Sequence, residues 1–159
     1  MPLTLDLLRH GHALPADRGG DSARVLSARG RRSLELLATR LTAEEWRPDR
    51  VFSSPYRRAS ETAAILLAAL SMPPAIEALD ELQPESSPTS TLEALTTLKI
   101  DGGRVLLVSH QPLLGRLTAL LSGAEQGFSP GTLVRFECPR GLRPGQVRLI
   151  ATYEPDQKS

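Results

Sequence analysis

Residues 3–12 read LTLDLLRHGH, an apolar run that passes directly into a polar cluster. A short, nearly continuous apolar run of this kind predicts a strand buried on both faces. In α/β sheets, ligands collect just beyond the carboxyl ends of the strands, which is where the cluster RHGH lies. Two later stretches repeat the arrangement, VFSSPYRR at residues 51–58 and VLLVSHQP at residues 105–112. We therefore expect the three polar clusters to meet in one crevice.

Helix and strand signals alternate along the rest of the chain. Helical apolar spacing, with leucines at i, i+3, i+4 and i+7, follows each polar cluster and appears once more between the second and the third. The starts of these helices are marked by N-cap or proline residues, namely Ser27, Ser54 with Pro55, Ser90 and Pro112. Residues 133–138 and 147–153 are rich in β-formers and are expected to pair as a hairpin.

This alternation predicts a single α/β domain over residues 1–155, with residues 156–159 as a frayed tail. The expected architecture is a three-layer α/β/α sandwich. Its sheet should be mostly parallel, with one antiparallel strand near the C-terminus. A length of 159 residues is sufficient for one sizeable core.

Composition excludes several classes of partner and site. The net charge of +1 gives no general attraction to nucleic acid or to a membrane surface, so any anion site must be local. No apolar stretch approaches membrane-spanning length. The single cysteine, Cys138, cannot form an internal disulfide, which suits a reducing compartment, and a cytoplasmic location is expected. The chain has no HExxH motif, Cys/His array or Walker lysine, so neither metal nor cofactor is predicted.

The residue types in the three clusters suit hydrolysis of a phosphoryl group by protein side chains alone. Arg9 and Arg57 can supply forked N–H donors to its oxygens. A neutral imidazole can attack phosphorus and form a covalent phosphohistidine that water later cleaves. His10 is the predicted nucleophile, because its cationic neighbours disfavour its protonated form and because Gly11 lets the backbone approach an anion closely. His110 would serve as a second phosphate donor or as a transition-state stabiliser.

The second histidine of the first cluster and the second arginine of the second cluster are not expected in the site. His12 is expected on the loop surface. Arg58 lies about 100° around the predicted helix from Arg57 and is expected to face away from the crevice. Arg57 is poorly placed for the helix dipole, which favours anions in the first turn, and this misfit indicates a functional reason for its presence.

The three clusters, in this order, resemble the signature segments of the histidine phosphatase superfamily, which has a phosphoglycerate mutase-like fold. The resemblance rests on RHG at residues 9–11, SPYRRASETA at residues 54–63 and SHQP at residues 109–112. DSARVLSARG at residues 21–30 and LDELQP at residues 79–84 extend it to the small bacterial SixA-type phosphohistidine phosphatases. Together these segments span residues 3 to about 121.

The resemblance implies roles for individual residues. It makes His10 the phosphorylated nucleophile and assigns phosphate binding to Arg9, Arg57 and His110. Glu81 corresponds to the family's proton donor, with Asp80 as the alternative. Ser22 and Arg24 could border the site.

Chain length between the second and third clusters bears on the substrate. Only about 50 residues separate them, which leaves no room for the helical insertion that covers the site in relatives acting on sugar phosphates. An open pocket suits a phosphate displayed on another protein. Phosphohistidine on a signalling, phosphotransfer or phosphocarrier protein is therefore the first expectation. Alternatives are a broad phosphatase of sugar or nucleotide phosphates and a non-catalytic phosphohistidine-binding module. Oligomeric state is not predicted.

Overall fold

A computed structural model describes residues 2–155. The residues for which a frayed tail is predicted, 156–159, lie outside the described part. The strands are β1 (Leu3–Arg9), β2 (Arg50–Ser53), β3 (Ile76–Ala78), β4 (Gly103–Ser109), β5 (Leu133–Cys138) and β6 (Arg148–Tyr153). The α-helices are α1 (Ala28–Ala43), α2 (Arg57–Leu67), α3 (Pro88–Thr97) and α4 (Leu113–Ser122), and short 3₁₀ turns occupy Asp21–Ala23 and Asp80–Leu82.

The strands form one mixed sheet in the order β3-β2-β4-β1-β5-β6. The pairs β3–β2, β2–β4 and β4–β1 are parallel, whereas β5 runs antiparallel to both β1 and β6. Because β1 and β4 are central parallel neighbours, their carboxyl ends open at the same edge of the sheet. The predicted fold class and the hairpin of the last two strands are confirmed.

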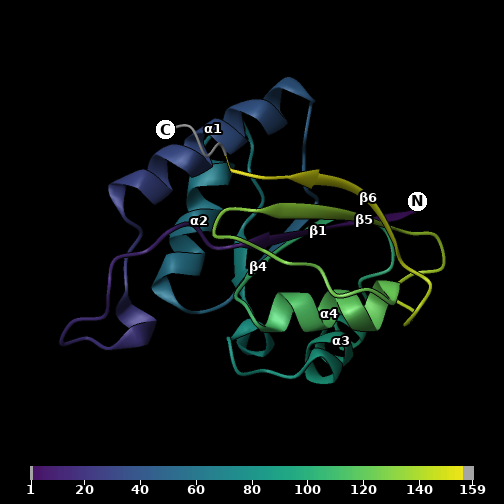
Figure 1. The fold of residues 1–159 in the computed structure, drawn as a ribbon. Helices are drawn as coiled ribbons and strands as arrows, with labels where there is room; N and C mark the ends of the chain where they lie inside the picture. Colours follow the sequence, from purple (N-terminus) through teal and green to yellow (C-terminus); the bar gives the residue numbers. More distant parts are fainter. Residues whose placement is uncertain (1, 156–159) are drawn as a thin grey trace.

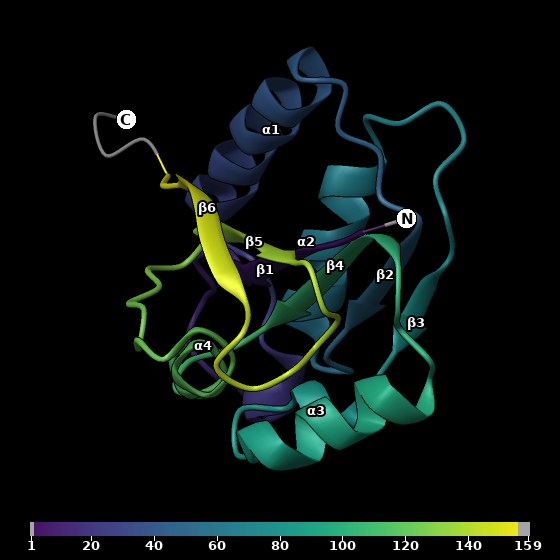
Figure 2. The same cartoon turned by 90° about the vertical axis from the view of Figure 1, so that its right-hand side faces the viewer.

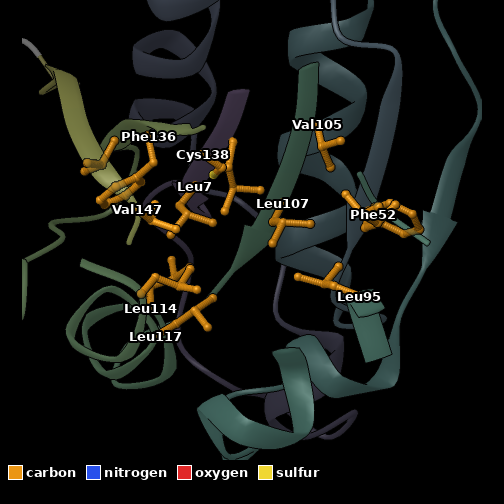
Figure 3. Packing of buried hydrophobic residues seen from close by; sticks show 14 of the residues in the cluster. Leu7, Phe52, Leu95, Val105, Leu107, Leu114, Leu117, Phe136, Cys138 and Val147 are labelled. Carbon is orange, nitrogen blue, oxygen red and sulfur yellow. The ribbon is translucent and has the colours of Figure 1, made fainter. Parts of the chain in front are cut away.

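Helices cover both faces of the sheet, as a three-layer sandwich requires (Figure 1). In both views α1 and α2 lie on one side of the strands and α3 and α4 on the other (Figure 2). Two buried clusters fill the two interfaces. Figure 3 shows the cluster on the α3/α4 side, where Leu7 and Leu107 of the central strands meet Leu95 of α3 and Leu114 of α4.

Alternation along β1 explains why one strand serves both layers. Leu3, Leu5 and Leu7 belong to the cluster on the α3/α4 side, whereas Leu8 belongs to the cluster on the α1/α2 side. Successive side chains of a strand point to opposite faces, so a continuous apolar run is what two covered faces require.

Asp6 interrupts this apolar run on the α1/α2 face and is fully buried. Its two carboxylate oxygens accept hydrogen bonds from Arg135 Nε at 2.8 Å, Arg104 Nη1 at 3.1 Å and the Trp46 indole at 2.8 Å. Arg135 also donates to the hydroxyl of Tyr153. These bonds compensate the loss of water around the buried carboxylate.

Element boundaries differ from the sequence prediction at three places. Helix α2 begins at Arg57 with Tyr56 as its N-cap, not at Pro55, and α3 is capped by Ser87, whose side chain accepts from the N–H of Ser90. Strand β3 was not predicted, because its three residues are half-exposed or exposed and show no periodicity. The Ser27 cap of α1 is confirmed by its bond from the Gly30 N–H.

No helix within residues 2–155 is both long enough and apolar enough to cross a membrane. The free Cys138 is buried on β5, and burial raises the pKa of its thiol to about 12. A protonated, inaccessible thiol is unsuited to redox or nucleophilic chemistry.

Candidate active site

The carboxyl ends of β1 and β4 bring two histidines together. Arg9 and Ser109 are paired at the ends of these strands, and the next residue of each chain segment is a histidine. The backbone N–H of His10 donates to the carbonyl of Ser109, which holds the two chain segments side by side. The rings of His10 and His110 lie 5.0 Å apart, centroid to centroid, at an angle of 58°. Both residues are buried, so the predicted meeting of the first and third clusters is confirmed.

The hydrogen bonds of His10 determine which nitrogen could react. Nδ1 lies 2.8 Å from the carbonyl oxygen of Gly11, which can only accept, so Nδ1 carries the proton. The lone pair of the neutral imidazole is then on Nε2. Nε2 lies 3.2 Å from Nε–H of Arg58, which donates to it. The ring is therefore held in one tautomer with its basic nitrogen turned toward a guanidinium.

Burial and cationic neighbours keep both imidazoles neutral. Burial lowers the pKa of His10 to about 4, and the charges of Arg58, Arg9 and Arg24 act in the same direction, while the bond to the Gly11 carbonyl opposes them. Burial likewise lowers the pKa of His110 to about 3, with His10 and Arg58 adding to the effect. At neutral pH both rings are uncharged, and His10 has the form that a nucleophile requires.

The second cluster presents Arg58, not Arg57, to the histidines, and the prediction for this pair of residues is wrong. The Arg58 side chain is 5% exposed and contacts His10, whereas the Arg57 side chain is 61% exposed and pairs with Glu61 at 3.1 Å. The reason is the phase of α2. Arg58 shares the buried helix face with Ala59 and Thr62, and Arg57 lies on the solvent side.

Sequence spacing contained the signal that distinguishes these two arginines. Arg57 and Glu61 are four residues apart with opposite charges, which is typical of an exposed helix face. Arg58 is four residues before Thr62, and both belong to the stripe that also holds Ala59 and Ala63. The motif resemblance, which assigned the phosphate contact to Arg57, was followed in place of this spacing.

Arg9 is anchored by the segment that precedes β5. Its Nη1 donates to the carbonyl of Phe128 at 2.8 Å, and its backbone N–H donates to the carbonyl of Thr132 at 3.0 Å. The N–H of Gly131 in turn reaches the carbonyls of Arg9 and His10. Among the described residues, the buried Nε of Arg9 has no hydrogen-bond partner. A buried donor without a partner is costly, and an anion beside it would remove that cost.

His110 also keeps one free nitrogen. Its Nε2 lies 2.8 Å from the hydroxyl of Ser54, and the ring of Tyr56 packs edge-on against it at 5.0 Å between centroids. Its buried Nδ1 has no partner within residues 2–155. Ser54 and Tyr56 thus hold the second histidine in place, although the sequence singled out neither for this role.

Gly11 has a packing role that differs from the predicted one. Its N–H donates to the hydroxyl of Thr62 at 3.0 Å and is therefore not available to an anion. A Cβ at this position would lie 2.8 Å from Leu34 Cδ1 and 3.3 Å from Leu26 Cδ2. Glycine is needed here because Leu26 and Leu34 approach the loop closely, and the predicted anion contact at Gly11 stays a prediction.

The loop before α1 brings a carboxylate to the pocket that the sequence did not single out. The carbonyl of Asp21 accepts from Arg58 Nη1 at 2.8 Å, and its carboxylate lies 3.3 Å from Arg58 Nη2. Arg24 pairs with the same carboxylate at 3.2 Å and bonds the carbonyl of Leu14. Arg24 therefore borders the site as predicted, whereas Ser22 is exposed on the adjacent 3₁₀ turn.

The predicted proton donors lie on the 3₁₀ turn after β3. Glu81 is half-buried on the 3₁₀ turn after β3, where its carbonyl accepts from Thr91, and Asp80 beside it is exposed. Among residues 2–155 the Glu81 carboxylate has no hydrogen-bond or ion-pair partner. The hydroxyl of Ser109 donates to the carbonyl of Leu82 at 2.6 Å, which fixes this turn against the end of β4.

His12 is exposed and belongs to the cap of α1. Its Nδ1 lies 2.7 Å from the hydroxyl of Ser27, which also accepts from the Gly30 N–H. The predicted surface position is confirmed. Within the described residues, no group of three or more His, Cys, Asp or Glu side chains is arranged to hold a metal ion.

The fold and the site together define a class of phosphoryl-transfer protein. Two neutral imidazoles and two buried or half-buried guanidiniums, Arg9 and Arg58, converge at the carboxyl edge of a central parallel pair. Guanidiniums can neutralise phosphoryl oxygens while an imidazole attacks phosphorus.

Comparison with known proteins identifies the family. Residues 5–85 match the model of the histidine phosphatase superfamily, branch 1. The phosphohistidine phosphatase SixA of Escherichia coli (strain K12) is 34% identical over 122 residues, which cover 75% of this chain and 74% of that protein. An uncharacterised protein of a Picosynechococcus species is 31% identical over 151 residues, covering 94% and 90% of the two chains.

The solved structures agree with this assignment. The protein histidine phosphatase SixA, solved with tungstate, superposes with a TM-score of 0.84 at 27% identity, covering 96% of this chain and 97% of that one. A SixA-type protein of Agrobacterium tumefaciens gives a TM-score of 0.80 at 24% identity, covering 98% and 100%, and shares the fold. The chain belongs to the histidine phosphatase superfamily, and its relatives support a phosphatase of the SixA type.

Proposed function

We propose that this protein removes phosphate from phosphohistidine on a signalling or phosphotransfer protein, through a phosphohistidine intermediate on His10. The observation that carries the proposal is the buried, single-tautomer His10 with Nε2 turned toward Arg58. Similarity to the E. coli phosphohistidine phosphatase over three quarters of the chain supports the substrate class.

In the first step, Nε2 of His10 attacks phosphorus. A bond forms between Nε2 and phosphorus, and the bond between phosphorus and the nitrogen of the substrate imidazole breaks. The leaving imidazole takes the electron pair and a proton, for which Glu81 is the proposed donor, and Glu81 regains a proton from the attacking water in the second step. In the second step, water attacks the phosphorylated His10, which releases phosphate and restores the imidazole.

Arg9, Arg58 and His110 would bind the phosphoryl oxygens during both steps. The unpartnered Nε of Arg9 and Nδ1 of His110 are buried nitrogens that such an oxyanion could satisfy. For this to occur, Arg58 must exchange its bond to His10 Nε2 for one to phosphate. The related SixA structure contains tungstate, a tetrahedral oxyanion, which supports a pocket of this kind here.

The absence of an enclosing segment supports a protein-borne phosphate. Between α2 and β4, residues 68–102 form β3, a 3₁₀ turn and α3. Helix α3 packs against α4 on one face of the sheet (Figure 2). An open mouth admits a phosphohistidine that projects from another protein, whereas a small sugar phosphate gains less from an unenclosed pocket.

The test compares kcat/KM for a histidine-phosphorylated phosphotransfer domain with kcat/KM for sugar and nucleotide phosphomonoesters. We expect the phosphohistidine protein to be preferred. Equal or higher values for phosphomonoesters would instead assign a broad small-molecule phosphatase, and binding without turnover would assign a non-catalytic module.

The same comparison in the Glu81→Gln variant tests proton supply. A phosphomonoester leaves as a poor alkoxide and needs a proton, while imidazole is a better leaving group. If Glu81 is the donor, its loss lowers phosphomonoester hydrolysis more than phosphohistidine hydrolysis. Equal losses on both substrates would show that Glu81 does not protonate the leaving group.

A further inference from the structure

Four arginines lie on the loop before α1 and in the first turns of α1 and α2, near the proposed phosphate site but outside it. This basic rim consists of Arg24, Arg29, Arg31 and Arg57. Arg29, Arg31 and Arg57 are exposed, and Arg24 is half-buried. Arg31 Nη2 and Arg57 Nε lie 3.5 and 3.1 Å from the same carboxylate oxygen of Glu61, which places the starts of the two helices side by side.

The rim keeps a positive charge after its ion pairs are counted. Glu61 faces both Arg31 and Arg57. Asp21 likewise faces both Arg24 and Arg58. Each carboxylate can neutralise one guanidinium, so each group carries one uncompensated cation. Arg29 has no carboxylate partner among residues 2–155 and adds another.

Helix electrostatics show that these cations are costly where they stand. The N-terminus of a helix has a partial positive charge and favours acidic residues in its first turn. Neither α1 nor α2 has an acidic residue there, and the sequences begin ARGRR and RRASE. The two helix termini and the arginines therefore reinforce one another, and together they carry a positive field near the site.

A second segment near the site carries acidic residues. Asp80, Glu81 and Glu85 lie on the turn after β3 and the loop that follows it. The Glu85 carboxylate accepts from the hydroxyl of Tyr56, whose ring contacts His110, so this acidic segment also borders the pocket. A partner that reaches the site meets both charged segments, and their field orients it.

We propose that the basic rim is the docking surface for an acidic segment that flanks the phosphohistidine of the partner protein. The proposal rests on the proposed function and adds to it the chemistry of the partner. Carboxylates beside the phosphohistidine would contact Arg29, Arg31 and Arg57, while the phosphoryl group enters between His10 and His110. Such charge complementarity raises association rates and sets orientation.

The test uses two synthetic peptides that each carry one phosphohistidine, flanked by glutamates in one and by glutamines in the other. We expect the intact enzyme to prefer the glutamate peptide by about tenfold in kcat/KM at low ionic strength. The preference should shrink at about 0.15 M salt, where the Debye length is about 8 Å.

The double variant Arg29→Gln/Arg57→Gln should lose most of this preference and keep its kcat/KM on the glutamine peptide within about twofold. The matched control is Arg140→Gln/Arg143→Gln. These two arginines are also exposed, but they lie beyond the end of β5, which is Cys138. Cys138 pairs with Leu3, and Leu3 is at the opposite end of β1 from Arg9. The control should keep the full preference.

Four results would count against the proposals, and they are distinguishable. No preference in the intact enzyme, or an unchanged preference in the rim variant, would overturn the docking surface alone. An equal loss on both peptides would show that Arg29 or Arg57 acts on the phosphoryl group itself. Failure of the intact enzyme to hydrolyse either peptide, while it hydrolyses p-nitrophenyl phosphate, would overturn the proposed function.

Discussion

Strand β1 has one buried polar cluster in its middle, around Asp6, and leads into another at its carboxyl end, around His10. The two clusters differ in how fully their polar atoms are hydrogen-bonded. Around Asp6, both carboxylate oxygens are bonded, to Arg104, Arg135 and Trp46. Around His10, the neighbouring Arg9 Nε and His110 Nδ1 lack partners within the described residues. In the Asp6 cluster, Arg135 Nη2 is the one buried side-chain atom that also lacks a hydrogen-bond partner among the described residues.

The difference separates a structural cluster from one prepared for a ligand. In the Asp6 cluster the anion is part of the chain, so both neighbouring guanidiniums already donate to a buried carboxylate. At the end of β1, cationic and polar donors converge without an anion of their own, apart from Asp21 at the rim of the site. An uncompensated buried donor costs stability and is retained where a ligand uses it.

Removing the proposed nucleophile should give the largest loss of activity. His10→Ala is expected to lower kcat at least about 10³-fold, since no covalent intermediate can form. The free energy of unfolding should change little, because the ring packs at the edge of the core. Phosphate trapped during turnover should label His10 in the unaltered enzyme, and label on His110 or on a serine would refute the assignment.

A substitution in the Asp6 cluster should instead lower the stability of the protein and leave its activity unchanged. Asp6→Asn is expected to lower the free energy of unfolding by about 3 kcal/mol, because Arg135 and Arg104 lose their buried counter-charge. The folded fraction should keep its kcat. Urea unfolding measures the first quantity, and Arg148→Gln, at the exposed pair with Glu137, is the control with an expected loss below about 1 kcal/mol.

The two adjacent arginines of α2 provide a narrower test. Arg58→Ala should lower kcat/KM on the order of 10²-fold, as loss of a preorganised oxyanion donor does. Arg57→Ala should leave the hydrolysis of free phosphohistidine within about threefold of the unaltered enzyme, because its side chain faces solvent. Comparable losses in the two variants would contradict the orientation of α2.

The smallest expected effect concerns pH. Because the pKa values of His10 and His110 are lowered to about 4 and about 3, their ring signals in NMR spectra should not titrate between pH 8 and 5.5. Histidines of the unfolded chain take up protons near pH 6.5, so unfolding binds protons and stability falls as the pH is lowered below that value. Each histidine adds at most about 1.4 kcal/mol per pH unit to this slope. A midpoint near pH 6.5 for either ring would show that burial does not shift it.

Sequence patterns predicted the sheet and the histidines, because each rests on local signals. Apolar runs gave the central strands, and residues directly after a strand end are placed by the strand itself, as for His10 and His110. Arg58 was mispredicted because the motif resemblance assigned the phosphate contact to Arg57, although Arg58 lies four residues before Thr62 on the stripe of Ala59 and Ala63. The packing constraint on Gly11 was not predicted, because it comes from Leu34, a contact made only when α1 packs on the loop.

The hydrogen bonds that hold Arg9 determine when the site can form during synthesis of the chain. Ribosomes release the chain from its N-terminus, so the residues of all three signature segments emerge before the carbonyls of Phe128 and Thr132 that hold Arg9. A nascent chain that ends before residue 128 contains every proposed catalytic side chain and lacks the support of one of them. The pocket is therefore completed only when the segment before β5 has left the ribosome and closed against the first strand.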